Sequence, residues 1–481
     1  MTTAVEEYDV VILGGGTGGT VAAWTFASEG QRVAVIERKY IGGSCPNIAC
    51  LPSKNIIHSA KVASYLKRGH EFGLSDGTFA VDMRVVRDRK RRMVSRWNEV
   101  YLENYKRSGA ELIHGSGRFI GPKLLQATLP DGKTRHLHGR NVVVNVGTHA
   151  KIEQVPGLAE AQPLTHIEAL ELDEVPPHLI VLGSGFVGLE FAQAIRRFGS
   201  KVTVLGRASR LLQGEDPDVS DALQTLFSDE GIDLILNATI KRLSGKSGVT
   251  IRVLLEKNGI GSQKTVEGSH LLVATGRTPN TKEIGLDAAG VDCDHNGFIK
   301  VNDRLETTAP GIWAIGEAAG SPQFTHVSVD DFRVVYAGIT GGKRVTTGRQ
   351  IPFCLFTDPE LARIGLSEKS AKEQGIAYRL FKVPMEVVMR ATTLSETRGF
   401  LKALVETHTD RILGFTAFGI GAAEIMTSVQ IAMSAGLPYT TLRDSILTHP
   451  TLVEGLIPLF SSAASTINGG APHKTLEAAT D

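Results

Sequence analysis

The sequence predicts an α/β protein of more than one domain, and three observations carry this prediction. The chain has 481 residues, more than a single hydrophobic core usually organises. Its composition, 42% hydrophobic and 21% charged, is that of a globular protein. Some of its 52 glycines form two short clusters, and each cluster directly follows an apolar run typical of a buried parallel strand.

The first glycine cluster lies in residues 8–37. YDVVIL (8–13) predicts a buried strand, the stretch after the glycines predicts a helix, and a second strand ends at Glu37. The glycines have the spacing GxGxxG: Gly14, Gly16 and Gly19. This spacing permits a tight turn and lets the backbone approach a pyrophosphate at the helix N-terminus, while Glu37 can accept a hydrogen bond from a ribose hydroxyl. The segment therefore predicts a dinucleotide site.

The same pattern recurs in HLIVLGSGFVGLEFAQAIRRFGSKVTVLGR (178–207). Its glycines are Gly183, Gly185 and Gly188. One GxGxxG is a weak signal, but two copies in full strand–turn–helix–strand context favour nucleotide binding over βαβ units without a ligand. In place of an acid the second copy has Gly206, followed by Arg207 and Arg210. Guanidinium groups bind a ribose 2′-phosphate that a carboxylate would repel, so NADPH is predicted rather than NADH; two solvated surface arginines are the alternative.

Two of the four cysteines, Cys45 and Cys50, lie close together just after the first fingerprint. In a regular helix five residues rise about 7.5 Å and turn half-way round, whereas a disulfide needs Cα atoms within about 7 Å. A distorted first turn is therefore expected, with Pro46 at the first helical position and Pro52 disrupting the helix one turn later. A helix N-terminus would also lower a thiol pKa. A redox-active dithiol is predicted over a two-ligand metal site, which no second CxxC or His cluster completes, and over two unrelated thiols.

The segment GGSCPNIACLPSK (42–54), placed after that fingerprint, resembles the class I pyridine nucleotide–disulfide oxidoreductases, which include glutathione reductase, dihydrolipoamide dehydrogenase and mercuric reductase. Four further segments extend the resemblance over nearly the whole chain. They are LLVATGRTPN (271–280), TTAPGIWAIGEAAG (307–320), IPFCLFTDPELARIGLSE (351–368) and ILTHPTLVEGL (446–456).

The resemblance implies two Rossmann-like dinucleotide-binding domains, for FAD and NADPH, plus a C-terminal α+β dimerisation domain. The FAD-binding domain is expected to span residues 1–149 and 273–346, and the NAD(P)H-binding domain residues 150–272. Residues 347–468 would form the dimerisation domain and residues 469–481 a tail.

The resemblance also implies roles for individual residues. Cys50 would be the flavin-proximal thiol and Cys45 the thiol that attacks the substrate. Lys54 would lie near the flavin N5 and pair with Glu190. The acid–base His449, oriented by Glu454, would come from the partner subunit, so a homodimer would be required for activity. The residues expected at FAD are Gly14, Gly16, Gly19, Glu37, Ser44, Lys54, Gly117 and Glu317, and those at NADPH are Gly183, Gly185, Gly188, Arg207, Arg210 and Gly276.

Two departures from the family pattern bear on function. Glu317 stands where the family usually has Asp, and its longer side chain could still accept a ribitol hydroxyl. Pro46 and Ala49 give the Cys-Pro and Ala-Cys pairs that occur in ketone-carboxylating members of the family. Those members have no His–Glu pair, so the presence of His449 and Glu454 disfavours carboxylation.

The predicted function is that of an FAD-dependent NADPH:disulfide oxidoreductase acting on a small-molecule disulfide. One alternative is a metal-ion reductase for Hg(II) or Cu(II), since GSPQFTHVSVDDFRVV (320–335) is similar to a subgroup linked to metal-ion reduction. A dihydrolipoamide dehydrogenase-like enzyme would prefer NADH, against Arg207 and Arg210. A non-enzymatic redox sensor is the remaining alternative. No resident metal is predicted.

Charge and hydropathy bound the partners and the compartment. A net charge of +1 gives little support to nucleic-acid binding, and the basic run RDRKRR (87–92) is expected to form a solvated helix face. No apolar run approaches the ~18–20 residues of a membrane span, and the first residues do not resemble a signal peptide. We therefore expect a cytoplasmic protein that binds neither membranes nor nucleic acid.

Overall fold

The computed structural model describes residues 4–75, 79–257 and 261–468, so the predicted tail (469–481) lies outside the described residues. The chain divides into two compact units. The first comprises Met1–Pro177, Arg242–Ile251 and Ser269–Arg349, and the second His178–Lys241, Arg252–Gly268 and Gln350–Asp481. The first unit holds the cysteine pair and the first fingerprint, and the second unit holds the second fingerprint.

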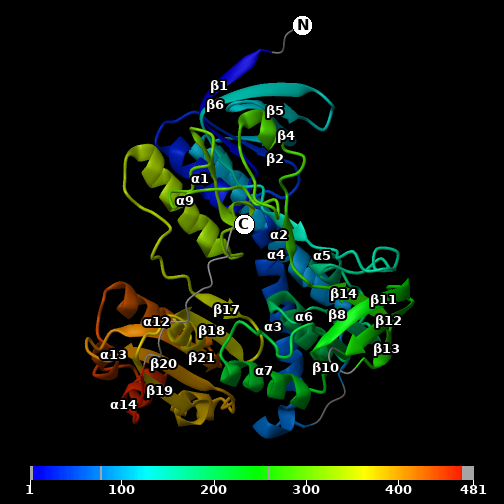
Figure 1. Cartoon of the computed structure of the whole chain (residues 1–481). Helices are drawn as coiled ribbons and strands as arrows, with labels where there is room; N and C mark the ends of the chain where they lie inside the picture. Colours follow the sequence, from blue (N-terminus) through cyan, green and yellow to red (C-terminus); the bar gives the residue numbers. More distant parts are fainter. Residues whose placement is uncertain (1–3, 76–78, 258–260, 469–481) are drawn as a thin grey trace, which may run out of the picture. The chain divides into compact units, whose positions relative to one another are not determined.

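A largely parallel sheet forms the centre of the first unit (Figure 1). Its strand order is β3-β2-β1-β6-β5-β4, and β16 also pairs with β6. The strands are β1 (Val5–Leu13), β2 (Val33–Glu37), β3 (Glu111–His114), β4 (Ser116–Gly121), β5 (Leu124–Thr128), β6 (Thr134–Val144) and β16 (Ile312–Ala314). β1 lies parallel to both β2 and β6, whereas β4, β5 and β6 form an antiparallel meander. The parallel pairing of β1 with β2 confirms the unit predicted for residues 8–37.

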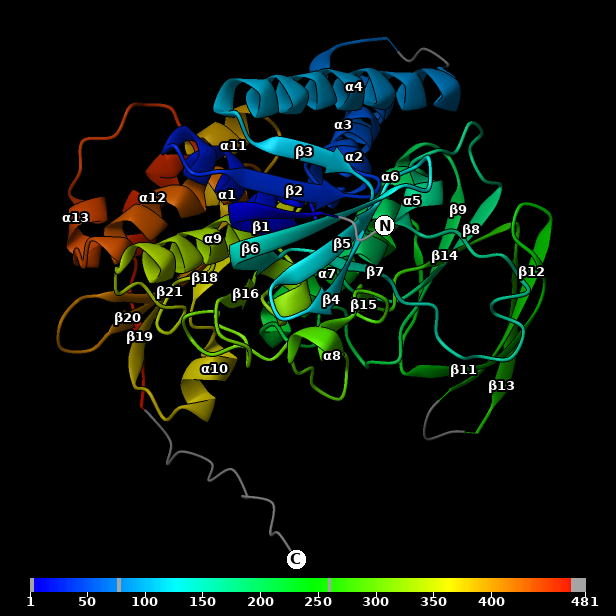
Figure 2. The ribbon, with the colours of Figure 1, turned by 90° about the horizontal axis from the view of Figure 1, so that it is seen from above.

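Helices cover this sheet, and its core has two sides. Along β1, Val10 and Ile12 face one apolar cluster, whereas Val11 and Leu13 face the other, as the alternation of a strand requires. The helices α1 and α9 pack together over the first cluster, where Phe26 meets Phe332 (Figures 1 and 2). The helices of the unit are α1 (Thr17–Ser28), α2 (Ser44–Ile48), α3 (Cys50–Lys67), η1 (Gly69–Phe72), α4 (Met83–Ser108), α5 (His166–Ala169), α8 (Leu286–Ala289), η2 (Gly316–Ala319) and α9 (Thr325–Thr340). Its short strands β7 (Thr148–Ala150) and β15 (Arg277–Pro279) form an antiparallel pair, and β14 spans His270–Val273.

The second unit begins with a parallel βαβ unit, as its glycine fingerprint predicts. β8 (His178–Leu182) lies parallel to β9 (Lys201–Leu205), which lies parallel to β10 (Asp233–Ile235). Helix α6 (Phe186–Arg197) connects β8 to β9, and α7 (Pro217–Asp229) precedes β10. The strands that follow along the chain are β11 (Ala238–Lys246), β12 (Thr250–Lys257) and β13 (Gln263–Gly268).

An antiparallel sheet with helices completes the second unit. Its strand order is β17-β18-β21-β20-β19-β22. The elements are β17 (Phe353–Leu355), β18 (Glu360–Gly365), α10 (Glu368–Glu373), β19 (Tyr378–Pro384), η3 (Met385–Val387), α11 (Met389–Thr393), β20 (Phe400–Glu406), β21 (Ile412–Gly419), α12 (Ala422–Ser434), α13 (Tyr439–Arg443), η4 (Val453–Gly455), α14 (Leu456–Ser461) and β22 (Ser465–Ile467). An apolar core centred on Phe415, Met426 and Phe460 joins sheet and helices. This is the α+β arrangement expected at the C-terminal end.

Two further expectations can be compared with the fold. Within the described ranges, no helix combines the length and the apolar character that crossing a bilayer requires. The finer domain boundaries expected near residues 149, 272 and 346 stay predictions.

Candidate active site

The first glycine turn joins β1 to α1 and leaves no room for side chains. Gly14 has a φ of +97°, and a Cβ built on it would lie 2.5 Å from the backbone oxygen of Asn145. A Cβ on Gly19 would lie 2.7 Å from the Gly14 oxygen, so the first turn of α1 packs directly on the loop. Asn145 Oδ1 accepts a hydrogen bond of 2.9 Å from Gly19 N. The bare backbone fits the close approach of a pyrophosphate.

Glu37 ends β2 beside this turn and is held by the backbone. Its Oε2 accepts a hydrogen bond from Gly15 N at 2.7 Å, and its Oε1 accepts bonds from Lys39 N at 2.7 Å and Tyr40 N at 2.9 Å. These bonds fix the carboxylate at the edge of the fingerprint. Oε2 accepts one bond and keeps a lone pair, so the ribose contact of Glu37 stays a prediction that its position supports.

The cysteines lie on either side of a break between two helices. Helix α2 ends at Ile48, Ala49 leaves the helical region with φ −134° and ψ −101°, and α3 begins at Cys50. This break confirms the distorted turn expected between the cysteines. The expected roles of the prolines are wrong. Pro46 is the third residue of α2 rather than the first, and Pro52 is the third residue of α3, which continues to Lys67. A proline is tolerated in a first turn because the N–H groups there have no intrahelical partner.

The segment that carries the cysteines packs on the fingerprint. Gly43 has a φ of +79°, and a Cβ on it would lie 2.6 Å from Gly16 Cα. Thr17 Oγ1 donates a hydrogen bond of 3.1 Å to the Gly42 oxygen. Ser44, which is expected at FAD, is the first residue of α2. The dithiol is therefore fixed directly against the turn that would hold the dinucleotide.

The two thiols are not equivalent. Neither cysteine forms a disulfide, and Cys50 Sγ lies 3.3 Å from the hydroxyl oxygen of Thr325, the first residue of α9. A hydrogen bond between the two cysteine side chains raises the pKa of Cys45 strongly, and burial adds to this. Thr325 and the charge of Lys54 oppose the rise without cancelling it. The lowered pKa expected from the helix N-terminus is therefore wrong for Cys45, because the shared proton stays on its sulfur.

Glu317 lies in η2 with its carboxylate already bonded. Its Oε2 is bonded to the hydroxyl of Thr148 and accepts a hydrogen bond from Arg277 Nε at 3.0 Å. Arg277 also donates to the backbone oxygen of Thr148 at 3.0 Å. Nearby, burial and the charge of Arg277 lower the pKa of His166 to about 4. The ribitol contact of Glu317 stays a prediction.

Packing against neighbouring strands explains why residue 117 is a glycine. A Cβ on this residue of β4 would lie 2.5 Å from Leu13 Cδ1 and 3.0 Å from Ile36 Cγ2. The close approach of β4 to the apolar side of β1 and β2 accounts for the residue, and its contact with FAD stays a prediction.

The second glycine turn, in the other unit, opens onto a cavity. A Cβ on Gly188 would lie 2.4 Å from the Gly183 oxygen, whereas a Cβ on Gly185 would meet nothing within 4 Å. Beside Gly185 is a cavity of about 320 Å³. Its lining residues are Ser184, Gly185, Phe186, Leu212, Gln213, Gly214 and Glu215. This geometry fits a nucleotide that approaches the turn at Gly185.

The position of the missing acid is surrounded by side chains. A Cβ on Gly206 would lie 2.8 Å from Leu236 Cδ2 and 3.1 Å from Ser184 Oγ. Arg207, the next residue, is exposed. Arg210 forms an ion pair of 2.7 Å with Asp221. Arg210, which is expected at a 2′-phosphate, thus has a carboxylate partner. Gly276, expected at NADPH, lies in the first unit with a φ of +138° and open space around it.

Glu190 is buried in α6. Its Oε1 accepts a hydrogen bond of 3.0 Å from Phe356 N, which comes from the C-terminal part of the same unit. The expected pairing with Lys54 would join the two units and stays a prediction.

His449 and Glu454 are brought together as expected. His449 Nδ1 lies 3.2 Å from Glu454 Oε1. A backbone hydrogen bond of 2.8 Å from Thr451 N reaches the other oxygen of Glu454 and, with the bond to His449, holds the pKa of Glu454 below its usual range. The His449 side chain is 63% exposed, so this pair lies on the surface of the described chain.

Several contributors had no signal in the sequence. Thr325 is 275 residues from Cys50, and Asn145 is 126 residues from Gly19. Threonine at a helix start and asparagine at a strand end are common features with no particular spacing. Only the arrangement of the chain shows that these two residues serve the site.

Comparisons with known proteins agree with this geometry. Residues 8–331 match the family described as "Pyridine nucleotide-disulphide oxidoreductase", and residues 351–458 match its dimerisation domain. The chain is 35% identical over 463 residues to the "Probable pyridine nucleotide-disulfide oxidoreductase RclA" of Escherichia coli, covering 95% of this chain and 99% of that protein. It is 31% identical to a mercuric reductase of Staphylococcus aureus, covering 94% of this chain and 81% of that protein.

A solved structure shows the same fold. The structure described as "Cu(II) complex of HOCl-induced flavoprotein disulfide reductase RclA from Escherichia coli" superposes with a TM-score of 0.86 at 34% identity, covering 95% of this chain and 99% of that one. This similarity confirms the predicted fold class. The chain belongs to the pyridine nucleotide-disulphide oxidoreductase family, whose members use FAD and a nicotinamide nucleotide.

Proposed function

We propose that the chain is an FAD-dependent NADPH:disulfide oxidoreductase that reduces a small-molecule disulfide. The observation that supports this most directly is the cysteine pair. Gly43 fixes its segment against the fingerprint turn, and the proton of the pair is held on Cys45 while Cys50 contacts Thr325. Charge on Cys50 and a proton on Cys45 is the arrangement that a two-electron dithiol relay needs beside a flavin.

The residues of the chain would divide the work as follows. When bound, FAD supplies hydride acceptance from NADPH and transfer of the electron pair to the cysteines. The reduced Cys45, once it loses its proton, attacks the substrate disulfide, forming a mixed disulfide and releasing one substrate thiolate. Cys50 then attacks Cys45 Sγ, which restores the Cys45–Cys50 disulfide and releases the second substrate thiolate. Two electrons enter and two leave in each cycle.

His449 would supply the protons that this exchange moves. An imidazole can take the proton of Cys45 and give it to the departing substrate thiolate. The carboxylate of Glu454, 3.2 Å from Nδ1, would fix the tautomer and orientation of the ring. Since the pair lies on the surface of the described chain and the C-terminal region matches the family's dimerisation domain, we place His449 and Glu454 in the active site of the partner subunit.

The proposed preference for NADPH over NADH is argued from the residues that follow β9. Gly206 stands where an acid would bind a ribose 2′-hydroxyl, and the exposed Arg207 follows directly. The cytoplasmic location expected from the sequence stays a prediction.

Reduction of a metal ion is the second candidate function. A similar solved structure is a Cu(II) complex of RclA, and a mercuric reductase is among the relatives. A dithiol is a suitable ligand and electron donor for either ion. In this reaction no substrate thiolate leaves, so it would not need His449.

An anaerobic titration of the purified flavoprotein with NADPH tests the proposal. Two-electron reduction should produce a long-wavelength thiolate–flavin absorbance band, and Cys50→Ser should abolish it. Loss of the oxidised flavin spectrum without this band would contradict the relay through the cysteines. A panel of small-molecule disulfides, Cu(II) and Hg(II) then identifies the acceptor. Turnover that His449→Ala leaves unchanged would favour the metal ion over the disulfide.

A further inference from the structure

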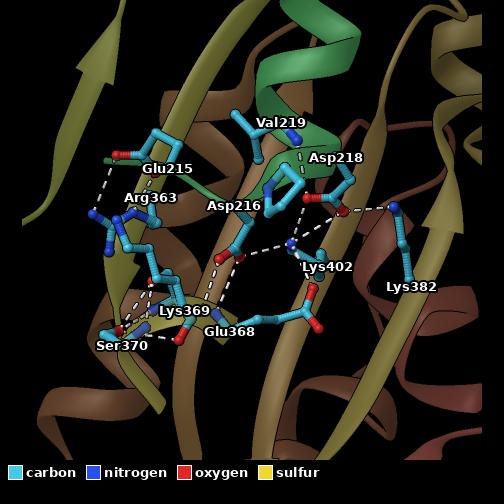
Figure 3. Close-up of polar contacts among 12 residues, drawn as sticks. Glu215, Asp216, Asp218, Val219, Arg363, Glu368, Lys369, Ser370, Lys382 and Lys402 are labelled. Carbon is cyan, nitrogen blue, oxygen red and sulfur yellow. Dashed lines mark hydrogen bonds and ion pairs between the residues drawn. The ribbon is translucent and has the colours of Figure 1, made fainter. Parts of the chain in front are cut away.

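A fully buried lysine lies among three carboxylates in the second unit. The side chain of Lys402, on β20, is 0% exposed. Its Nζ donates hydrogen bonds to Asp216 Oδ2 at 2.8 Å, Asp218 Oδ1 at 2.9 Å and Glu368 Oε1 at 2.9 Å (Figure 3). These carboxylates lie close enough to one another to hold a metal ion, but the ammonium group already lies among them. Lys402 and Asp216 are both buried, and burying charges is costly unless they are paired as they are here.

The cluster ties the start of α7 to the C-terminal sheet. Asp216, which precedes α7, also accepts hydrogen bonds from the backbone N–H groups of Glu368 at 3.1 Å and Lys369 at 2.9 Å. Asp218 forms a second ion pair, of 2.6 Å, with Lys382 (Figure 3). Burial opposes the charge on Asp218, but the bonds from Lys382 and Lys402 outweigh it and hold its pKa below its usual range. The two acids are therefore held in place by groups from β19, β20 and α10.

The segment directly before this anchor forms one wall of the nucleotide cavity. Residues 212–215 line it opposite Ser184, Gly185 and Phe186 of the second fingerprint. No helix or strand spans residues 206–216, between β9 and α7, so side-chain contacts add to the few backbone hydrogen bonds that hold the segment. Glu215, the last residue of the wall, accepts hydrogen bonds from Arg363 Nε at 2.8 Å and Nη2 at 3.3 Å (Figure 3).

Arg363 is also linked to the opposite wall, through the ring of Phe353. Its guanidinium lies 4.7 Å from the centre of the Phe353 ring, and that ring packs against Phe186 with the centroids 5.5 Å apart. Both walls of the cavity are therefore held by contacts with residues 353–402 of the C-terminal part.

We propose that Lys402 and Arg363 are positioning residues for the nicotinamide nucleotide: they hold residues 212–216 as a wall beside the second glycine turn. The C-terminal part of the chain would in this way set nucleotide affinity in addition to forming the dimer. This inference rests on the proposed use of the second fingerprint for the nicotinamide nucleotide, and it is independent of the final acceptor.

The change Arg363→Gln tests the inference, and Arg398→Gln is its matched control. Arg398 also joins the C-terminal part to α7, through an ion pair of 2.7 Å with Asp229, but it does so at the other end of the helix. The measurement is the rate of flavin reduction at increasing NADPH concentration in a stopped-flow instrument, which needs no acceptor. We expect Arg363→Gln to raise the NADPH concentration at half-maximal rate about 10-fold, with the limiting rate within about twofold of the wild type.

The controls separate positioning from folding and from the proposed function. Arg398→Gln should leave both values unchanged, and Arg363→Lys should recover part of the affinity. Lys402→Met should also raise the NADPH concentration at half-maximal rate. If this variant fails to fold, the result for Arg363→Gln, a change at a more exposed residue, decides the test. If Arg363→Gln and Arg398→Gln need the same NADPH concentration for half-maximal flavin reduction, this inference is overturned and the proposed function is not affected. A wild-type flavin that NADPH does not reduce would overturn the proposed function and the inference together.

Discussion

At the scale of single residues, the position of one proton makes the two thiols of the cysteine pair different. Cys45 keeps its proton because Cys50 accepts it in a hydrogen bond, and burial adds to the effect. The hydroxyl of Thr325 lies 3.3 Å from Cys50 Sγ and is placed there by the start of α9. The pair therefore has a built-in asymmetry, because the proton is favoured on Cys45 and not on the sulfur that we place next to the flavin.

Thr325→Val should make the thiolate of the pair less stable without changing the shape of the site. Valine keeps the size of the side chain but removes the hydroxyl, and a hydrogen bond to a charged group contributes about 1.5–3 kcal/mol. In the two-electron-reduced protein, the thiolate–flavin absorbance band should appear at a higher pH, by about one pH unit. A spectrophotometric pH titration measures this midpoint.

The matched control is Thr340→Val at the other end of α9. The Thr340 hydroxyl bonds within the helix, to the Tyr336 oxygen at 2.8 Å, so its loss should leave the midpoint in place. An unchanged midpoint in Thr325→Val would mean that the hydroxyl does not act on the thiolate.

Arg207→Gln should change the choice of nucleotide. If Arg207 binds the 2′-phosphate, its loss should raise the KM for NADPH roughly 10- to 100-fold and leave the KM for NADH nearly unchanged. Arg210→Gln should have a smaller effect, because Arg210 is paired with Asp221 at 2.7 Å. Steady-state kinetics with both nucleotides provide the comparison. Equal losses with NADPH and NADH in Arg207→Gln would argue against the phosphate contact.

At the scale of elements, the sequence predicted what depends on neighbours along the chain. The fingerprint turns at Gly14–Gly19 and Gly183–Gly188 were predictable because strand, turn and helix follow one another directly. The break between α2 and α3 was also expected, but its cause was misread. The chain leaves the helix at Ala49, and Pro52 lies in the first turn of the next helix rather than ending one. A proline three residues into a helix and a proline that breaks one look the same in a sequence.

The start of α5 gives the first unit a sensitivity to acid. His166 is buried, and among the described residues its Nε2 has no hydrogen-bond partner. Burial and the charge of Arg277 lower its pKa to about 4. Above pH 6.5 the ring is neutral whether the chain is folded or unfolded. As the pH falls from 6.5 toward 4, the unfolded chain gains a proton that the folded chain does not, so the free energy of unfolding decreases.

His166→Asn should therefore flatten the pH dependence of stability. From the shifted pKa, the wild type should lose about 2 kcal/mol of unfolding free energy at pH 5 relative to pH 8 through this residue alone. The variant should have a lower Tm at pH 8, because packing is lost, but a smaller fall in Tm between pH 8 and pH 5. The same change at His295, whose ring is exposed, should keep the wild-type fall. A parallel fall in His166→Asn would exclude the buried ring as the cause.

At the scale of the whole molecule, the fold class and the family could be predicted from the sequence, but the long-range contacts could not. The cysteine segment, the fingerprints and the His449–Glu454 pair are each contained within short stretches of chain. Lys402 and Asp216 are 186 residues apart and meet only because β20 and the start of α7 come together in the second unit. A lysine in the strand FLKALVE predicts an edge or solvated position, yet the fold buries it completely.

A mixed-dimer experiment tests whether the active site is shared between subunits. Cys45→Ser and His449→Ala should each abolish disulfide reduction as homodimers. In a mixed dimer, one site would combine both defects, whereas the other would combine the intact Cys45 of one subunit with the intact His449 of its partner. Random exchange makes about half of the dimers mixed, so about a quarter of the wild-type activity should return. If both residues act within one chain, every site carries a defect and no activity returns. Recovery would assign His449 to the partner's dithiol, which the exposure of its side chain on the described chain already favours.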